Sequence, residues 1–256
     1  TQCFRDHEIV LNNLSQINSG SLTYSWDFGD NQNSNQNNPS HNYQSFGNYT
    51  VELSVSSNFN CFDTLEKNVE IYPMPSANFE FNDSTQCINI QNFIIDNQSN
   101  IASGTLEQNW LLSNGFNSNL FEPQFIFNQS GNYWIRLIEN SNFNCKDTVI
   151  KTFEVYPKPY PDFSINDETQ CLNINQFVFQ DQGNIDYGTY QNIWDFGDGS
   201  IAQSINTQHI YSFDGSFTVK LLSISNNNCT DSISYPIIVY PRTTGDLLIN
   251  DSNQCI

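Results

Sequence analysis

The sequence predicts an all-β protein built of small antiparallel β-sandwich modules in a linear array, and three observations lead to this prediction. Residues of the same type recur at a strict step of 84 positions along the 256-residue chain. Short runs in which apolar and polar residues alternate are separated by polar turns, which is typical of half-buried strands. No amphipathic period of 3.6 residues persists for three turns, so no helix is expected.

The repeat of 84 residues is carried mainly by cysteines and tryptophans. Residues related by this step include Cys3, Cys87, Cys171 and Cys255; Cys61, Cys145 and Cys229; and Trp26, Trp110 and Trp194. The step is long for a solenoid unit but suits an autonomous sandwich of about 80–100 residues. The expected modules are therefore 1–74, 75–158 and 159–242, followed by the first strand of a fourth in 243–256. Since the first module has no counterpart of the strand expected at 76–82, we interpret the sequence as an excerpt from a longer array.

The middle module serves as a template for the strands. Its expected strands are 76–82, 88–95, a strand around Trp110, 132–139 and 146–155. In the first of these, Phe79 and Phe81 fall on one face because side chains alternate along a strand. A polar turn over 83–86 is expected before Cys87. The three tryptophans at equivalent positions are expected in the module cores.

The joints between modules contain the motif Tyr-Pro-x-Pro. It occurs at Tyr72–Pro75 and Tyr156–Pro159, whereas the third joint has Thr243 in place of the second proline. Two prolines fix φ at alternate positions and favour an extended, semi-rigid connection. The third joint is therefore expected to be looser.

The charge balance excludes two classes of partner. The formal net charge is −19, and the chain has only eight Lys and Arg residues. Too few cations are present to neutralise a run of phosphates, so no nucleic acid partner is expected, and docking on anionic lipid is disfavoured. No apolar stretch approaches the length of a membrane span, so membrane insertion of this segment is not expected.

The seven cysteines indicate structural disulfides. They stand in register, no Cys-x-x-Cys pair occurs, and the histidines are not at ligand spacing from them. This pattern argues against zinc and favours disulfides in an oxidising, extracellular setting.

Two modules contain a distinctive aromatic and acidic motif. It reads WDFGDN at Trp26–Asn31 and WDFGDG at Trp194–Gly199, and each copy precedes an aromatic-x-x-x-Gly-x-aromatic element, at Tyr43–Tyr49 and Tyr211–Phe217. These segments resemble the PKD (polycystic kidney disease) domain. The resemblance implies an immunoglobulin-like antiparallel β-sandwich and covers essentially the whole chain in tandem copies. The middle copy departs from it at Trp110–Gly115, which keeps the tryptophan and the turn glycine but has neither aspartate.

The resemblance also implies a setting for the parent protein. Segments of the form Asn-Cys-x-Asp-Thr/Ser, such as Asn144–Thr148, look like PKD arrays in large surface adhesins of Bacteroidota, including gliding-motility adhesins. This similarity implies a secreted protein anchored at the cell surface.

The aspartates of the motif are candidate calcium ligands. The pairs are Asp27 with Asp30 and Asp195 with Asp198, and paired carboxylates offer the hard oxygen atoms that Ca²⁺ prefers. The alternative is a tight turn in which the side chains cap backbone amides. No other cofactor is expected.

An enzymatic role is not expected. His41 and His209 share one position of the repeat, which Phe125 occupies in the middle module, so this position indicates packing. The serines and cysteines show no arrangement of nucleophile and base.

One modification is a candidate. Thr64, Thr148 and Ser232 each follow an aspartate and precede an aliphatic residue. This is the pattern of Bacteroidota O-glycosylation that the resemblance brings in, while the alternative is simple strand alternation with an outward hydroxyl.

Three function classes remain open. The first is a non-catalytic spacer or stalk in an extracellular adhesin filament, whose partners are the neighbouring repeats. The second is a module that binds surface glycans or proteins itself, for which Phe59 and Phe143 are candidate contacts. The third is an accessory domain of a secreted hydrolase. Tandem copies with no other sequence between them favour the spacer.

Two disulfide pairings compete. Pairing within modules joins Cys3–Cys61, Cys87–Cys145 and Cys171–Cys229. Pairing between neighbouring modules joins Cys3–Cys145 and Cys87–Cys229, and leaves Cys61, Cys171 and Cys255 with partners outside the sequence. In an immunoglobulin-like sandwich, Cys87 and Cys145 fall at opposite ends, roughly 20 Å apart, whereas a disulfide needs Cα atoms within about 7 Å. The topology implied by the resemblance therefore favours the inter-module pairing.

Overall fold

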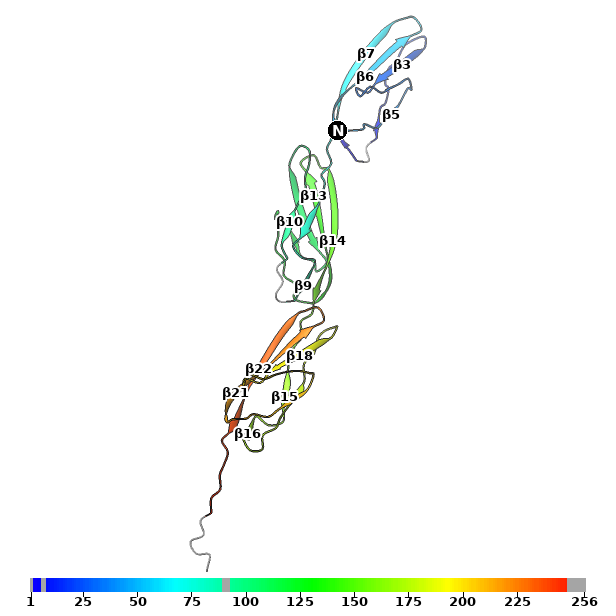
Figure 1. The fold of residues 1–256 in the computed structure, drawn as a ribbon. Coiled ribbons are helices and arrows are strands. Elements are labelled where there is room, and N and C mark those ends of the chain that lie inside the picture. The colour runs from blue at the N-terminus through cyan, green and yellow to red at the C-terminus, as the bar shows by residue number, and fades with distance from the viewer. Residues whose placement is uncertain (1, 6–7, 89–92, 248–256) are drawn as a thin grey trace, which may run out of the picture. The chain divides into compact units, whose positions relative to one another are not determined.

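The computed structural model describes residues 2–5, 8–88 and 93–247, and the regular elements in this part of the chain are strands (Figure 1). The strands form three successive groups, each with one five-stranded sheet and one smaller sheet. We call these groups module 1 (β1–β7), module 2 (β8–β14) and module 3 (β15–β22). Residues 84 or 168 positions apart are called equivalent. No helix within the described residues is long and apolar enough to span a bilayer.

Module 1 contains two sheets, with orders β1-β7-β6-β3-β4 and β2-β5. Its strands are β1 (Gln2–Cys3), β2 (Ile9–Val10), β3 (Leu22–Asp27), β4 (Asn33–Ser34), β5 (Ser40–His41), β6 (Gly47–Ser57) and β7 (Phe62–Tyr72). The pairing of β1 with β7 is parallel, and the remaining pairings are antiparallel.

Module 2 has the sheet orders β12-β11-β13-β14-β9 and β10-β8. Its strands are β8 (Phe79–Phe81), β9 (Thr85–Cys87), β10 (Ile95–Asn97), β11 (Leu106–Leu112), β12 (Asn117–Ser118), β13 (Gly131–Ser141) and β14 (Lys146–Tyr156).

Module 3 has the sheet orders β16-β22-β21-β18-β19 and β15-β17-β20. Its strands are β15 (Phe163–Ile165), β16 (Thr169–Cys171), β17 (Phe177–Asp181), β18 (Tyr190–Asp195), β19 (Ile201–Gln203), β20 (Thr207–His209), β21 (Gly215–Ser225) and β22 (Thr230–Tyr240).

The long hairpin of each module follows directly from residue alternation. In module 3, β21 and β22 pair antiparallel from Gly215↔Val239 to Ile224↔Thr230. Along β21 the inward residues Val219, Leu221 and Ser223 are buried, while their neighbours are more exposed. A period of two places these side chains on one face, and that face becomes the wall of the core.

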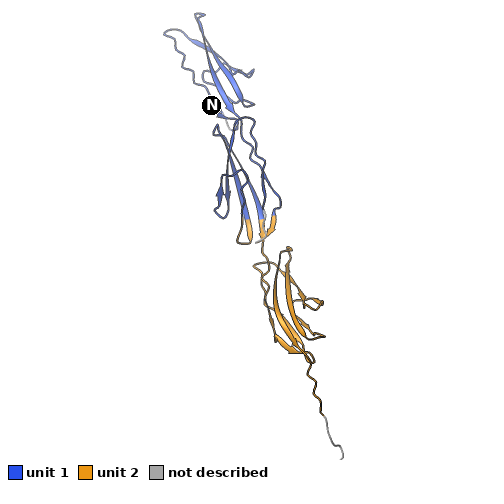
Figure 2. Ribbon diagram, turned by 90° about the vertical axis from the view of Figure 1, so that its left-hand side faces the viewer, with its two compact units in different colours: residues 1–84, 93–125, 133–153 blue, residues 85–92, 126–132, 154–256 orange. Residues whose placement is uncertain are grey.

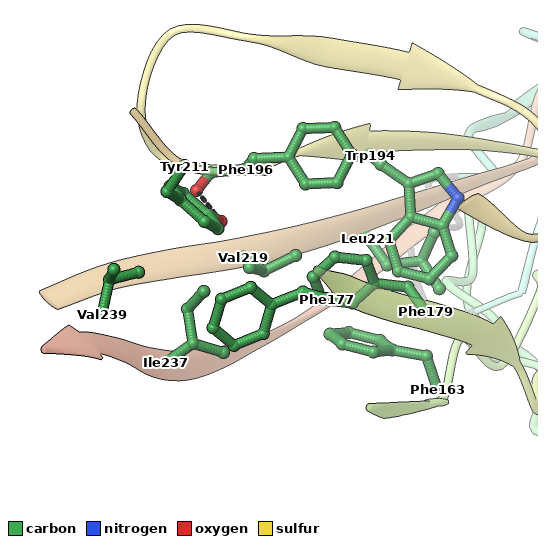
Figure 3. Packing of buried hydrophobic residues seen from close by; sticks show 10 residues of the cluster. All are labelled: Phe163, Phe177, Phe179, Trp194, Phe196, Tyr211, Val219, Leu221, Ile237 and Val239. Atoms are coloured by element: carbon green, nitrogen blue, oxygen red, sulfur yellow. Dashed lines mark hydrogen bonds between the residues drawn. The ribbon is translucent and has the colours of Figure 1, made fainter. Parts of the chain in front are cut away.

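The core of module 3 lies between its two sheets and is largely aromatic (Figure 3). Phe163 of β15 meets the ring of Trp194 edge-on at 5.0 Å, and Phe179 of β17 lies 5.6 Å from the same ring. The indole Nε1 donates a hydrogen bond to the carbonyl of Ser204 at 2.9 Å. All three equivalent tryptophans are buried, and Trp26 and Trp110 donate in the same way to Gln36 and Leu120.

The WDFGD segment forms a tight turn that packs closely on the neighbouring hairpin strand. Gly197 has φ +77°, and a Cβ atom built there would lie 2.7 Å from the carbonyl oxygen of Thr218. Glycine is therefore required both for the backbone conformation and for the close approach. Asn31, which replaces the last glycine of the motif in module 1, adopts φ +69°, and asparagine tolerates this left-handed region.

The chain divides into two compact units whose boundary runs through module 2 (Figure 2). Unit 1 contains residues 1–84, 93–125 and 133–153, and unit 2 contains 85–92, 126–132 and 154–256. Module 1 and the joint that follows it belong to unit 1. Module 3 and the joint that precedes it belong to unit 2.

Three expectations for the strands need correction. The segment before Cys87 was expected to be a turn, but Thr85–Cys87 is the short strand β9 because it pairs in parallel with the end of β14. The second strand was expected at 88–95, whereas β10 begins at Ile95, opposite β8, and 89–92 lie outside the described residues. Of the fourth module's expected strand, 243–247 form no strand and 248–256 lie outside the described residues.

Candidate functional site: the disulfide-linked joints

One cysteine of each joint is presented by a tight turn at the end of the long hairpin. In module 2, the amide of Ser141 donates to the carbonyl of Cys145 at 2.8 Å, and Asn144 adopts φ +62° within the turn. The Ser141 hydroxyl accepts hydrogen bonds from the amides of Phe143 and Cys145. Asn60 and Asn228 adopt the same backbone conformation in the other modules, so all three hairpins present a cysteine from the same turn.

The other cysteine of each joint lies on a short parallel strand at the opposite end of a module. In module 1, β1 pairs with the end of β7 in the register Cys3↔Tyr72, and the amide of Phe4 donates to the carbonyl of Tyr72 at 2.9 Å. In module 2, β9 places Cys87 opposite Tyr156. The cysteine therefore stands beside the tyrosine that begins the Tyr-Pro connection.

The first joint is closed by a disulfide between Cys3 and Cys145. Their Cα atoms are 5.6 Å apart, and the two residues are 142 positions apart in sequence. Beside the disulfide, Arg5 Nη1 donates to Asp147 Oδ1 at 2.9 Å, and the amide of Ala77 donates to Asp147 Oδ2 at the same distance. One carboxylate of module 2 thus binds both module 1 and the connecting segment.

The electrostatics of Asp147 reflect these contacts. Partial burial alone would raise the pKa of its carboxyl group. The hydrogen bonds from Ala77, Arg5 and the amide of Thr148, together with the positive charge of Arg5, outweigh that effect because they favour the charged form, so the pKa of Asp147 lies below its usual range. The charged carboxylate is therefore the form that the joint stabilises.

An aromatic pair adds an apolar contact to the first joint. The ring of Tyr72, at the end of β7, stacks on Phe143 in the hairpin turn of module 2, with centroids 4.3 Å apart and planes 9° from parallel. Phe143 was expected as a candidate ligand contact. In the structure it packs against Tyr72 within the joint.

The second joint repeats the disulfide but uses other side chains around it. Cys87 and Cys229 are joined with a Cα–Cα distance of 5.5 Å, again 142 positions apart. Lys158, from the connecting segment, donates to Asp231 Oδ2 at 2.6 Å. Burial alone would raise the pKa of Asp231, but the hydrogen bonds from Lys158 and the amide of Ser232, together with the positive charge of Lys158, outweigh burial and lower the pKa. The Tyr187 hydroxyl donates to the carbonyl of Val155 at 3.2 Å.

The structure thus contains both disulfides of the inter-module pairing that the sequence favours. Cys61 and Cys171, whose partners were expected outside the sequence, are free and exposed. Cys255 lies outside the described residues.

The candidate calcium residues make hydrogen bonds within their own loops. Asp27 Oδ1 accepts from the amide of Gly29 at 2.8 Å, and Asp30 Oδ1 accepts from the amide of Gln32 at 3.1 Å. Asp195 and Asp198 accept from the equivalent amides, of Gly197 and Ser200. Within the described residues, no group of three or more His, Cys, Asp and Glu side chains is arranged to hold a metal ion.

The two histidines lie in aromatic stacks beside these loops. His41 stacks on Phe28 at 4.1 Å, meets Tyr43 edge-on and lies 2.8 Å from Asp30 Oδ2. His209 repeats this arrangement, with Asp198 Oδ2 at 2.7 Å.

In module 2, the histidine and the aspartate of this stack are both replaced. Phe125 occupies the position of the histidine, Asn114 that of the aspartate and Leu112 that of the stacking phenylalanine. Phe125 meets Phe116 edge-on at 5.1 Å. The position is therefore a packing position that accepts either a histidine–aspartate pair or an aromatic pair.

The hydroxyl residues expected as O-glycosylation sites are accessible. Thr64, Thr148 and Ser232 are exposed on β7, β14 and β22. The aspartates that precede two of them, Asp147 and Asp231, are the acids of the joints.

The family of the chain is decided by a domain-model comparison. The model of the PKD domain matches residues 3–71 and 158–239, which together are more than half of the chain. The chain belongs to the PKD domain family. The matched ranges correspond to modules 1 and 3, which carry the two aspartates that module 2 lacks.

Solved structures of PKD domains resemble single modules of this PKD chain. The PKD1 domain of Vibrio anguillarum Epp is 19% identical, with a TM-score of 0.30, over 33% of this chain and 96% of that one. The PKD1 domain of the Vibrio cholerae metalloprotease PrtV is 22% identical, with a TM-score of 0.29, over 34% and 99%.

One tandem structure supports the immunoglobulin-like fold. The N-terminal eight Ig domains of Down Syndrome Cell Adhesion Molecule are 10% identical, with a TM-score of 0.55, over 95% of this chain and 36% of that one. At this identity the similarity concerns the fold alone. The PKD chain is therefore an all-β array of immunoglobulin-like modules, as the sequence predicts.

Proposed function

We propose that these PKD modules are spacers of an extracellular surface adhesin, and that the overlapping disulfides limit how far the array extends under tension. The observation that carries the proposal is the pairing of cysteines across each joint. A disulfide within one module would limit the extension of that module only. One that bridges two modules also holds the joint, whose other covalent connection is the short Tyr-Pro-x-Pro segment.

The covalent connectivity sets the maximum extension between Cys3 and Cys229. Positions 3 and 229 differ by 226, so without disulfides the intervening chain extends to about 750–810 Å at about 3.3–3.6 Å per residue. With both disulfides, the shortest covalent path runs from Cys3 to Cys145, back along the chain to Cys87 and across to Cys229. Positions 87 and 145 differ by 58, so this path extends to only about 190–210 Å. Unfolded modules would therefore remain tethered at roughly a quarter of their full contour.

The extracellular setting is part of the same proposal. Disulfides persist in oxidising compartments, and an acidic surface keeps a tandem array soluble and disfavours self-association. The partners proposed are the neighbouring modules. The structural contacts of Phe143 in the joint weaken the alternative in which the modules bind surface glycans through exposed turn aromatics.

Electron microscopy of the intact parent protein on its cells tests the spacer role, with a label fused next to the PKD modules. A spacer places the label in a stalk between the cell surface and a distal head. A label inside a compact catalytic body would instead support the accessory-domain alternative and overturn the proposal.

A further inference from the structure

The disulfides of the joints connect cysteines that are far apart in the sequence although nearer ones are available. The two residues of each disulfide are 142 positions apart. Cys61 precedes Cys87 by only 26 positions, and Cys171 follows Cys145 by 26. Cys87 and Cys145 themselves are 58 positions apart. Each joint therefore bypasses closer cysteines in favour of a distant one.

An unfolded chain that is oxidised should pair its cysteines differently. The entropic cost of closing a loop rises as about 1.5 RT ln n, where n is the number of residues in the loop. Closing a loop of 26 residues rather than one of 142 is therefore favoured roughly ten-fold. This preference selects Cys61–Cys87 and Cys145–Cys171, whereas Cys61 and Cys171 are free in the structure.

The order of synthesis adds to this preference for local pairs. Domains generally fold from the N-terminus onwards while the chain is being made. Cys61 and Cys87 are both present before Cys145, and long before Cys229, the partner of Cys87 in the structure. In an oxidising compartment, local disulfides therefore form before the hairpin of the next module exists.

A local disulfide within module 2 is incompatible with its fold. Cys87 pairs with Tyr156 at one end of β14, whereas Cys145 directly precedes the other end of this strand. Positions 145 and 156 differ by 11, which corresponds to about 35 Å along a strand. A disulfide needs Cα atoms within about 7 Å. A Cys87–Cys145 disulfide therefore prevents β9 from pairing with β14 and must be broken before module 2 is complete.

The non-covalent contacts of the first joint select the distant partner. Tyr72 stacks on Phe143, and Arg5 pairs with Asp147. Phe143 and Asp147 lie two positions on either side of the hairpin cysteine, and Arg5 lies two positions after the cysteine of β1. The hairpin turn is held by hydrogen bonds within residues 141–145, so it does not need β9 in order to form. These contacts bring the two cysteines together when the joint forms.

The finished disulfides are shielded from further exchange. Cys145 is 1% exposed and Cys229 is 0% exposed. Exchange requires a thiolate to reach a disulfide sulfur atom, so a disulfide of a folded joint is withdrawn from the reaction, whereas disulfides in unfolded segments stay open to attack. Folding of the joints therefore drives exchange towards the pairing in the structure.

We infer that this chain matures by thiol–disulfide exchange, and that its partner in this reaction is a thiol–disulfide isomerase. The isomerase thiolate attacks Cys145 Sγ in a Cys145–Cys171 disulfide, which forms a mixed disulfide and releases the Cys171 thiolate. The Cys3 thiolate then attacks the mixed disulfide at Cys145 Sγ, which forms Cys3–Cys145 and releases the isomerase thiolate. One disulfide replaces another, so no oxidant is consumed. The inference rests on the pairing of the cysteines and does not depend on the spacer role.

Refolding of the full chain tests the exchange. The reduced chain is oxidised with diamide in concentrated urea, and peptide mapping without reductant should then find mainly local pairs. After the urea is removed, a glutathione buffer with protein disulfide isomerase should convert these pairs into Cys3–Cys145 and Cys87–Cys229, at least ten-fold faster than the buffer alone. The inference would be overturned if these two pairs already dominated in urea, if the local pairs persisted, or if the isomerase left the rate unchanged.

The selection by joint contacts has an internal control in the same molecule. Phe143→Asn weakens the first joint only, so it should slow the formation of Cys3–Cys145 about two-fold or more. The formation of Cys87–Cys229 should keep its rate. Equal slowing of both disulfides, or of neither, would show that the joint contacts do not direct the exchange.

Secretion tests the partner in cells. The full chain is exported to the periplasm of a bacterial host that contains a disulfide isomerase and of the same host without it. The host without the isomerase should accumulate local pairs, and the double variant Cys61→Ser with Cys171→Ser, which removes the nearest competitors, should depend on the isomerase less. Equal amounts of the two joint disulfides in both hosts would mean that the chain folds before it is oxidised, and the inference would be wrong.

Discussion

Arg5 and Asp147 lie 142 positions apart in sequence, yet their side chains form an ion pair with a 2.9 Å separation between Nη1 and Oδ1. This is the same sequence separation as that of Cys3 and Cys145, which form the disulfide beside them. The ion pair and the disulfide therefore fix the same register between two modules. An acid equivalent to Asp147 occurs at Asp231, where Lys158 supplies the cation instead.

The pH dependence of the first joint follows from Asp147. The pKa of Asp147 is lower in the folded state than in the unfolded chain, where it is near the ordinary aspartate value of about 3.9. The stability that Asp147 contributes is therefore fully present above that value and is lost as pH falls through the lower pKa of the folded state. Asp147→Asn should remove this part of the acid sensitivity. Urea unfolding at several pH values between about 2 and 6 measures it. Asp63→Asn, at the exposed equivalent position, is the control, and an equal effect of both variants would contradict the assignment.

The stack of Tyr72 on Phe143 should stabilise the first joint. Phe143→Asn reproduces the residue of module 3, Asn227, and should cost more than about 0.5–1.5 kcal/mol, which is what an aromatic pair contributes beyond the apolar area that it buries. Phe59→Asn makes the same change at the exposed turn of module 1 and should have little effect. Differential scanning calorimetry of the two variants gives the comparison, and equal losses would mean that the stack adds nothing.

The buried tryptophans should dominate the stability of their modules. Trp110 is fully buried, and Trp110→Ala should destabilise module 2 by about 3–5 kcal/mol. Trp134, on the same module, is 38% exposed and provides the matched control, for which the loss should be much smaller. Chemical denaturation followed by circular dichroism measures both. A small effect at Trp110 would contradict the equivalence of the three cores.

The histidine stack predicts coupling between two positions. His41→Phe removes the partner of Asp30, and Asp30→Asn removes the partner of His41, so each single change should destabilise module 1. The double variant matches the residues of module 2, Phe125 and Asn114, and should be more stable than the sum of the two single losses predicts. A coupling energy of about 0.5–3 kcal/mol is expected for residues in contact. Strict additivity would show that the pair is not a unit.

Most of the strand framework could be predicted from the sequence because alternation is a local signal. The expected strands at 132–139 and 146–155 lie within β13 and β14, which the structure extends by a few residues at their ends. The short strand β9 could not be predicted in this way. Its three residues, Thr-Gln-Cys, carry no apolar alternation, and only the edge of β14 makes them a strand.

The joints could be predicted only in part. The common register of the cysteines and the topology of the sandwich point to pairing between modules. The cations could not be found from the repeat, because the first joint uses Arg5 of module 1 and the second uses Lys158 of the connecting segment.

Single-molecule pulling of the chain between handles at its two ends tests the inter-module disulfides most directly. Reduction should lengthen the fully unfolded chain by about 550–600 Å, because the path between Cys3 and Cys229 grows from 58 to 226 residue steps. The decisive sample is the oxidised double variant Cys87→Ser with Cys145→Ser, which removes one cysteine from each disulfide. It should extend as far as the reduced chain. Disulfides within modules would leave two links in this variant, each spanning 58 residues, one in module 1 and one in module 3. The extension of the oxidised variant would then be about 380–420 Å shorter than that of the reduced chain, and the account would be wrong.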